Sequence, residues 1–128
     1  MRWRIDKPFT PPFDVVETAD QIVVMVEVAG MRGDDFNLTL TRDLLVISGV
    51  RHRPDFEPGA YHRLEIGYGE FRIPIPIPWS VQTDAVEATY REGFLTVNLP
   101  RHQERQIRVV DLDQVTISAT EDDVTDDK

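Results

Sequence analysis

Cysteine is absent from the 128 residues of this chain, which excludes a disulfide framework and any chemistry that needs a thiolate. Long apolar runs are absent too: no stretch reaches the roughly 20 residues of a membrane span, and the amino-terminal residues lack the apolar centre of a signal peptide. Basic residues are scarce, because 14 Lys and Arg against 23 Asp and Glu give a formal net charge of −9. This charge has the wrong sign for phosphate groups. We therefore expect a cytoplasmic protein that binds neither nucleic acid nor membrane.

Residue patterns that carry catalysis or bind metals are also missing. The three histidines, His52, His62 and His102, have no metal-ligand spacing, and no cysteine is available to complete a zinc site. The acidic pairs Asp34-Asp35 and Asp122-Asp123 lack the spaced oxygen ligands of a calcium loop. No serine lies in a nucleophile elbow, and no glycine motif opens a helix that could hold phosphate. We expect a protein that is not an enzyme, with no catalytic residues, no metal site and no cofactor.

The chain does contain apolar residues in alternation, which is the period of a β-strand with one buried face. Seven segments show it: residues 13–18, 21–29, 36–41, 44–49, 71–78, 86–90 and 95–99. In the second of these, Val23 and Met25 add apolar residues on the other face, which predicts a central strand covered on both sides. We predict one all-β, immunoglobulin-like sandwich of seven or eight strands over residues 13–100. A short arm (1–12) precedes it, and a C-terminal extension (101–128) follows.

Prolines alternate along residues 71–78, at Pro74, Pro76 and Pro78. In a strand the amide groups of residues i and i+2 point to the same side, so these prolines remove the hydrogen-bond donors from one edge. The strand can therefore pair on one side only, which places it at the edge of a sheet with its isoleucines facing the core. We expect that it does not pair with its own copy in a second chain.

The last two segments meet at Glu92-Gly93, where Gly93 supplies the positive φ of a tight hairpin turn, and Pro100 ends the second strand. The pattern Ala88-x-x-x-Glu92-Gly93-Phe94-Leu95, followed by Leu99-Pro100-Arg101, resembles the closing hairpin of the α-crystallin domain of small heat-shock proteins. Residues 26–30 and 44–49 resemble the same family. The resemblance implies an ATP-independent chaperone, a holdase that binds partly unfolded proteins through apolar surface and prevents aggregation. One departure is Ile73, which stands where the family has an arginine that supports a subunit contact.

In bacterial and plant members of this family, a loop carries a strand that pairs with the partner subunit. Residues 61–68 resemble this strand and follow a polar loop of turn-forming residues, 51–59. We expect a dimer formed by strand exchange, or a small oligomer, rather than a large shell, because the amino-terminal arm is short. The residues expected at the exchange are Tyr61, His62, Leu64, Ile66, Val15 and Val16.

The resemblance also implies a groove and a plug that bind each other between subunits. Ile107 and Val109 stand where the family has its C-terminal pair of apolar plug residues, and Val115 with Ile117 is a second candidate. The groove residues would be Phe36, Leu38, Leu40, Val86 and Ala88. Alternation also assigns these five residues to the interior of the sandwich, so both interpretations remain open.

Two other functions fit a sandwich of this kind. One is a co-chaperone adaptor of CS type, which binds a folded partner, although such domains generally lack the exchanged strand and the plug. The other is a structural domain without clients. In the arm, Trp3, Ile5 and Phe9 either pack on the domain or contact another molecule, and the acidic residues 121–128 favour solubility.

Overall fold

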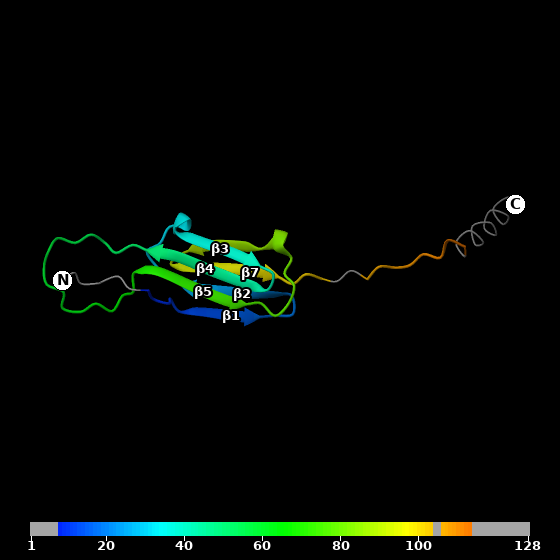
Figure 1. Cartoon of the computed structure of the whole chain (residues 1–128), viewed down its shortest axis with the longest axis horizontal. Helices are drawn as coiled ribbons and strands as arrows, with labels where there is room; N and C mark the ends of the chain where they lie inside the picture. The colour runs from blue at the N-terminus through cyan, green and yellow to red at the C-terminus, as the bar shows by residue number, and fades with distance from the viewer. Residues whose placement is uncertain (1–7, 104–105, 114–128) are drawn as a thin grey trace.

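The computed structural model describes residues 8–103 and 106–113, which contain a sandwich of two antiparallel β-sheets (Figure 1). The elements are β1 (Phe13–Glu17), β2 (Gln21–Glu27), η1 (Gly33–Asp35), β3 (Phe36–Thr41), β4 (Leu44–Arg51), β5 (Gly69–Pro76), η2 (Thr83–Ala85), β6 (Glu87–Arg91) and β7 (Phe94–Pro100). Each of the seven alternating segments corresponds to one strand, so the predicted all-β sandwich is confirmed. Over the described residues, no helix has the length and apolar character to cross a membrane.

The order of the strands gives each sheet two edges. The larger sheet has the order β1-β2-β7-β6, and the smaller one has the order β3-β4-β5. β1 and β5 form the edges along one side of the sandwich (Figure 1). β3 and β6 form the edges along the other side, where Phe36 and Tyr90 contact each other with ring centroids 5.1 Å apart.

The core lies between the two sheets and comes mainly from the inner strands and β5. Its members are Ile22, Val24, Val26, Val28, Met31, Leu45, Ile47, Phe71, Ile73, Ile75, Ile77, Leu95, Val97 and Leu99. β2 lies between β1 and β7, as predicted for a central strand, but its second face is not covered, because Met25 is 39% exposed. The prediction of cover on both faces is wrong: the other sheet packs on one face only, so Val23 and Met25 belong to the surface.

The hairpin between β6 and β7 turns at the two predicted residues. Glu92 and Gly93 have φ values of 51° and 84°, so both adopt the left-handed conformation of a two-residue type I′ turn. Gly93 also fits close to β2, because a Cβ atom there would lie 3.3 Å from the Cβ of Ala29. The predicted turn is confirmed, and it brings β7 alongside β2.

The proline-bearing strand, β5, lies at the edge of its sheet. The N–H of Ile77 donates to the carbonyl of Asp43 at 2.6 Å, which sets the alternation along the strand. Residues with odd numbers turn their backbone groups towards β4, and Pro74, Pro76 and Pro78 turn theirs to the free side. The predicted edge position and the inward direction of the isoleucines are both confirmed.

Residues 61–68 form no strand in this chain, contrary to the short strand that the sequence predicts. The chain leaves β4 at Arg51, projects beyond the end of the sandwich and returns to it at Gly69 (Figure 1). A strand needs a neighbour for its backbone hydrogen bonds, and none of the described strands pairs with this loop. The alternation at residues 61–66 therefore has no partner strand in the part of the chain that the structure describes.

Candidate functional site

The outer edge of β1 carries free backbone groups and exposed apolar side chains. The N–H of Thr18 donates to the carbonyl of Gln21 at 2.8 Å, so the even-numbered residues of β1 turn their backbone groups to β2. Those of Phe13, Val15 and Glu17 point outward, and no described strand pairs with them. Val15 and Val16 are 44% and 54% exposed and face opposite sides of the sheet. This edge can accept another strand.

The projecting loop carries the other residues expected at a strand exchange. Tyr61, Leu64 and Ile66 are all exposed, and so is Phe56, which the sequence analysis did not select. His62 is exposed as well, and the neighbouring Arg63 and Glu65 form a surface ion pair at 3.5 Å. The structure therefore presents apolar side chains on the loop but does not bring them to β1 of the same chain.

Arg51 holds the base of this loop, and sequence reasoning missed it. Its Nε donates to the carbonyl of Gly67 at 2.9 Å, and its Nη1 donates to the carbonyl of Ala29 at 3.2 Å. The guanidinium also lies against the rings of Phe9 and Tyr68, with its central carbon 5.0 and 5.3 Å from their centroids. One side chain thus joins the end of the loop, the end of β2 and the segment before β1. An arginine at the end of a strand gives no signal of this role in the sequence.

The five predicted groove residues lie along the side where β3 and β6 form the two edges, which we call the β3–β6 seam. Phe36, Leu38, Leu40 and Val86 are half-buried and pack against the core, and Ala88 is exposed. They therefore lie at the rim of the sandwich, between the two positions that the sequence leaves open: the interior of the sandwich and an exposed groove. The hairpin registers turn the backbone groups of Leu38, Leu40 and Ala88 towards the free edge, so the seam also offers hydrogen bonds. The N–H groups of Phe36 and Val86 are already bonded, to the carbonyls of Gly33 and Thr83.

Tyr90 closes the seam at its end and was also missed as a site residue. Its hydroxyl donates to the carbonyl of Val28 at 2.8 Å and accepts from the N–H of Met31 at 3.2 Å. Its ring contacts Phe36 on the opposite sheet. The alternation in β6 places Tyr90 on the inner face, but no sequence pattern indicates the backbone groups that its hydroxyl reaches.

The predicted plug residues lie on a segment that runs away from the sandwich (Figure 1). Ile107 and Val109 are 86% and 89% exposed, which is unusual for aliphatic side chains. The segment is anchored at its root, where the N–H of His102 donates to the carbonyl of Ser80 at 2.8 Å and Arg101 lies over the ring of Trp79. The alternative plug residues, Val115 and Ile117, lie outside the described residues.

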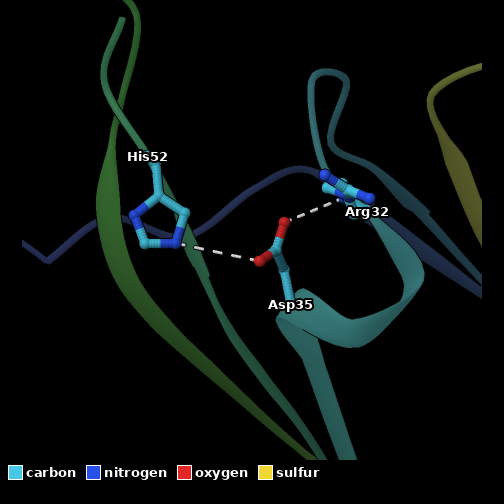
Figure 2. A network of polar contacts seen from close by, with 3 residues as sticks. All are labelled: Arg32, Asp35 and His52. Atoms are coloured by element: carbon cyan, nitrogen blue, oxygen red, sulfur yellow. Dashed lines mark hydrogen bonds and ion pairs between the residues drawn. The ribbon is translucent and has the colours of Figure 1, made fainter. Parts of the chain in front are cut away.

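One polar network connects η1 with the start of the loop (Figure 2). A carboxylate oxygen of Asp35 accepts the backbone N–H of Arg32 at 2.9 Å, and the other lies 3.7 Å from Nε2 of His52. This arrangement stabilises the turn before β3. Among the described residues no three His, Cys, Asp or Glu side chains gather as metal ligands would.

Comparison with known proteins identifies what the chain resembles. A profile of the Hsp20/alpha crystallin family matches residues 14–124. Spore protein SP21 of Stigmatella aurantiaca is 32% identical over 114 residues, which cover 88% of this chain and 66% of that protein. The 17.9 kDa class II heat shock protein of Helianthus annuus is 34% identical over 92 residues, which cover 70% of this chain and 58% of that protein. The matches thus span between 49% and 70% of the length of curated relatives of this kind.

Solved structures show the same fold. Heat shock protein 16.0 from Schizosaccharomyces pombe superposes with a TM-score of 0.67 at 29% sequence identity. The match covers 80% of this chain and 99% of that one, so it includes the entire sandwich and not a single sheet.

Proposed function

Because the chain belongs to the Hsp20/alpha crystallin family, whose members are small heat-shock proteins, we propose that it is an ATP-independent holdase. Its partners are partly unfolded proteins and further copies of itself. The observation that carries this proposal is that one chain has both open sheet edges and exposed apolar segments. The open edges lie at β1 and at the β3–β6 seam. The exposed segments are the loop at residues 61–66 and the C-terminal segment with Ile107 and Val109. Such surfaces can be covered by a second copy and uncovered for a client.

The first match is between the loop and β1. Residues 61–66 contain no proline, so every backbone group in them can join a ladder. Alternation puts Leu64 and Ile66 on one face, where they can join Phe13 and Val15 at the inner side of β1. The loop projects away from its own β1, so this pairing requires a second copy and produces a dimer by strand exchange.

The second match is between the C-terminal extension and the seam. Ile107 and Val109 share one face of an extended segment, while Arg108 between them faces away. Burying two aliphatic side chains on the half-buried row of the seam contributes about 3 to 5 kcal/mol before the cost of ordering the segment. A contact of this strength exchanges readily, so clients and plugs can compete for the same apolar row.

The direct test is suppression of aggregation by the pure protein, without ATP, on a thermolabile enzyme followed by light scattering. We expect suppression, and we expect Leu38→Asp to lose most of it, because a carboxylate on the seam repels apolar segments. Thr39→Asp is the matched control, since it adds the same charge one residue further on, at an exposed position on the outer face of β3. Its activity should equal that of the parent chain.

Two results would contradict the proposal. If the parent chain does not suppress aggregation, an adaptor for a folded partner becomes the better interpretation. If Leu38→Asp and Thr39→Asp lose activity equally, the seam is not the apolar surface that clients bind.

A further inference from the structure

An open hollow of about 660 Å³ lies at the end of the sandwich where the chain enters it. Phenylalanines from three separate segments line it: Phe9 before β1, Phe36 at the start of β3 and Phe71 in β5. Phe71 contacts the other two rings edge-on, with centroids 5.7 Å from Phe9 and 6.3 Å from Phe36. Phe71 is buried, but Phe9 and Phe36 are only half-buried. The hollow therefore has an aromatic floor that solvent reaches.

Two glycines keep this hollow in shape. A Cβ atom on Gly49 would lie 2.7 Å from the carbonyl oxygen of Asp35 and 2.9 Å from the ring of Phe71. A Cβ atom on Gly67 would lie 2.7 Å from the ring of Phe9. Both distances are too short for a side chain, so the backbone itself supports two of the three rings.

The rim of the hollow is mainly acidic. Asp34, Asp35 and Glu70 line it, together with the single cation Arg72. Asp35 already accepts the N–H of Arg32 and lies near His52 (Figure 2). Asp34 and Glu70 are exposed, and within residues 8–103 and 106–113 neither forms an ion pair. Two carboxylates beside an aromatic floor favour an occupant that combines an aromatic ring with positive charge.

The segment immediately before the hollow has this composition. Residues 2–5 read Arg-Trp-Arg-Ile, and the wall of the hollow begins at Pro8. The five residue-to-residue steps from Trp3 to Pro8 can span about 17 Å when extended, which is enough to turn back across the hollow. A tether this short gives an effective concentration in the millimolar range, so weak contacts suffice for docking within one chain.

We propose that residues 2–5 of the same chain dock in this hollow, with Trp3 over the rings of Phe36 and Phe71 and with Arg2 and Arg4 beside Asp34 and Glu70. The arm then covers an aromatic surface that would otherwise be exposed. This docking does not depend on chaperone activity, because it needs neither a client nor a second copy.

The absence of cysteine allows a direct test by disulfide formation in the full chain. Ile5→Cys is combined with Asn37→Cys, because Asn37 lines the hollow and is exposed. We expect an intrachain disulfide under mild oxidation. Adding Asp34→Lys and Glu70→Lys should slow its formation about fivefold, because two favourable charge pairs become repulsive.

A matched control separates docking from mere tethering. Asp43→Lys and Glu87→Lys make the same change in net charge at exposed positions that do not line the hollow, and should leave the rate unchanged. Arg2→Glu with Arg4→Glu should slow the reaction like the reversed hollow, and the two reversals together should restore it. Because Arg2 and Arg4 precede the sandwich, this second variant answers the question even if the reversed hollow fails to fold.

The outcomes decide between occupants. If none of the charge reversals alters the rate of disulfide formation, the arm reaches the hollow by diffusion alone, and the proposal is overturned. A disulfide that forms only between chains would also overturn it, and would make the arm of a second copy the occupant.

Discussion

β1 and β5 are the edge strands of the two sheets on the same side of the sandwich (Figure 1), but they differ in whether their outward backbone groups can pair with an incoming strand. Along β1 the outward backbone groups belong to residues that can donate, such as Val15. Along β5 the corresponding positions include Pro74 and Pro76, which have no N–H. Both strands bear apolar side chains, so hydrophobicity does not distinguish them. The pattern of backbone donors decides which edge can be extended.

This difference explains how one sandwich can offer an edge without aggregating through all of them. An edge with complete donors and alternating apolar residues pairs with any suitable strand, including another edge. The prolines of β5 prevent this at little cost, because they lie at positions that make no bond to β4. Of these two edges, β1 therefore keeps the outward donors that an incoming strand needs.

The largest effect should come from making β1 resemble β5. Val15→Pro removes one outward N–H without breaking a bond to β2. If residues 61–66 of a second copy pair there, losing a central donor and fixing φ should cost about 3 kcal/mol, or about a hundredfold in the dimer dissociation constant. Analytical ultracentrifugation over a dilution series measures this constant directly.

Val16→Pro is the comparison variant for that experiment. The N–H of Val16 belongs to the ladder with β2, so this substitution should lower the melting temperature instead of selectively weakening the dimer. A parent chain that stays monomeric at all concentrations, or a Val15→Pro variant with an unchanged dissociation constant, would show that β1 is not where copies pair.

A smaller effect is expected from the reverse exchange, in which β5 is made to resemble β1. Replacing Pro74, Pro76 and Pro78 by valine restores three outward donors while leaving the buried isoleucines in place. Sedimentation velocity should then reveal larger species that grow with concentration, because edges of different copies can pair. If the triple variant sediments like the parent chain, the prolines are not what prevents pairing at this edge.

The two edges also show what the sequence can and cannot predict. Pro74, Pro76, Pro78 and Gly93 were interpreted correctly, because their effect depends on backbone chemistry that acts wherever the residue lies. The strand predicted at residues 61–68 does not form, because a strand exists only beside a partner and none of the described strands pairs with this loop. The same holds for the outer face of β2, where alternation cannot tell whether a second layer is present.

The residues that were missed have a common reason. Arg51 and Tyr90 act through backbone carbonyls from segments far away in the chain, at Gly67, Ala29 and Val28. Only the folded arrangement of the strands brings those carbonyls within reach. The groove residues were interpreted as either core or rim for a related reason, since half-burial depends on how far the opposite sheet extends.

The smallest effect should come from Arg51→Lys. This variant tests whether the position of the projecting loop, which supplies the exchanged strand, matters as much as the β1 edge that receives it. Lysine keeps the charge, but it loses the planar group that bonds to two carbonyls at once and stacks on Phe9 and Tyr68. Losing one of these hydrogen bonds should cost about 1 kcal/mol, or about fivefold in the dimer dissociation constant if Arg51 holds the loop in its projecting position.

Hydrogen exchange separates this effect from general destabilisation: amides of residues 61–68 should exchange faster while those of β2 and β7 do not. If β2 and β7 lose protection to the same extent, Arg51 supports the sandwich as a whole, and the position of the loop is set by the partner that receives it.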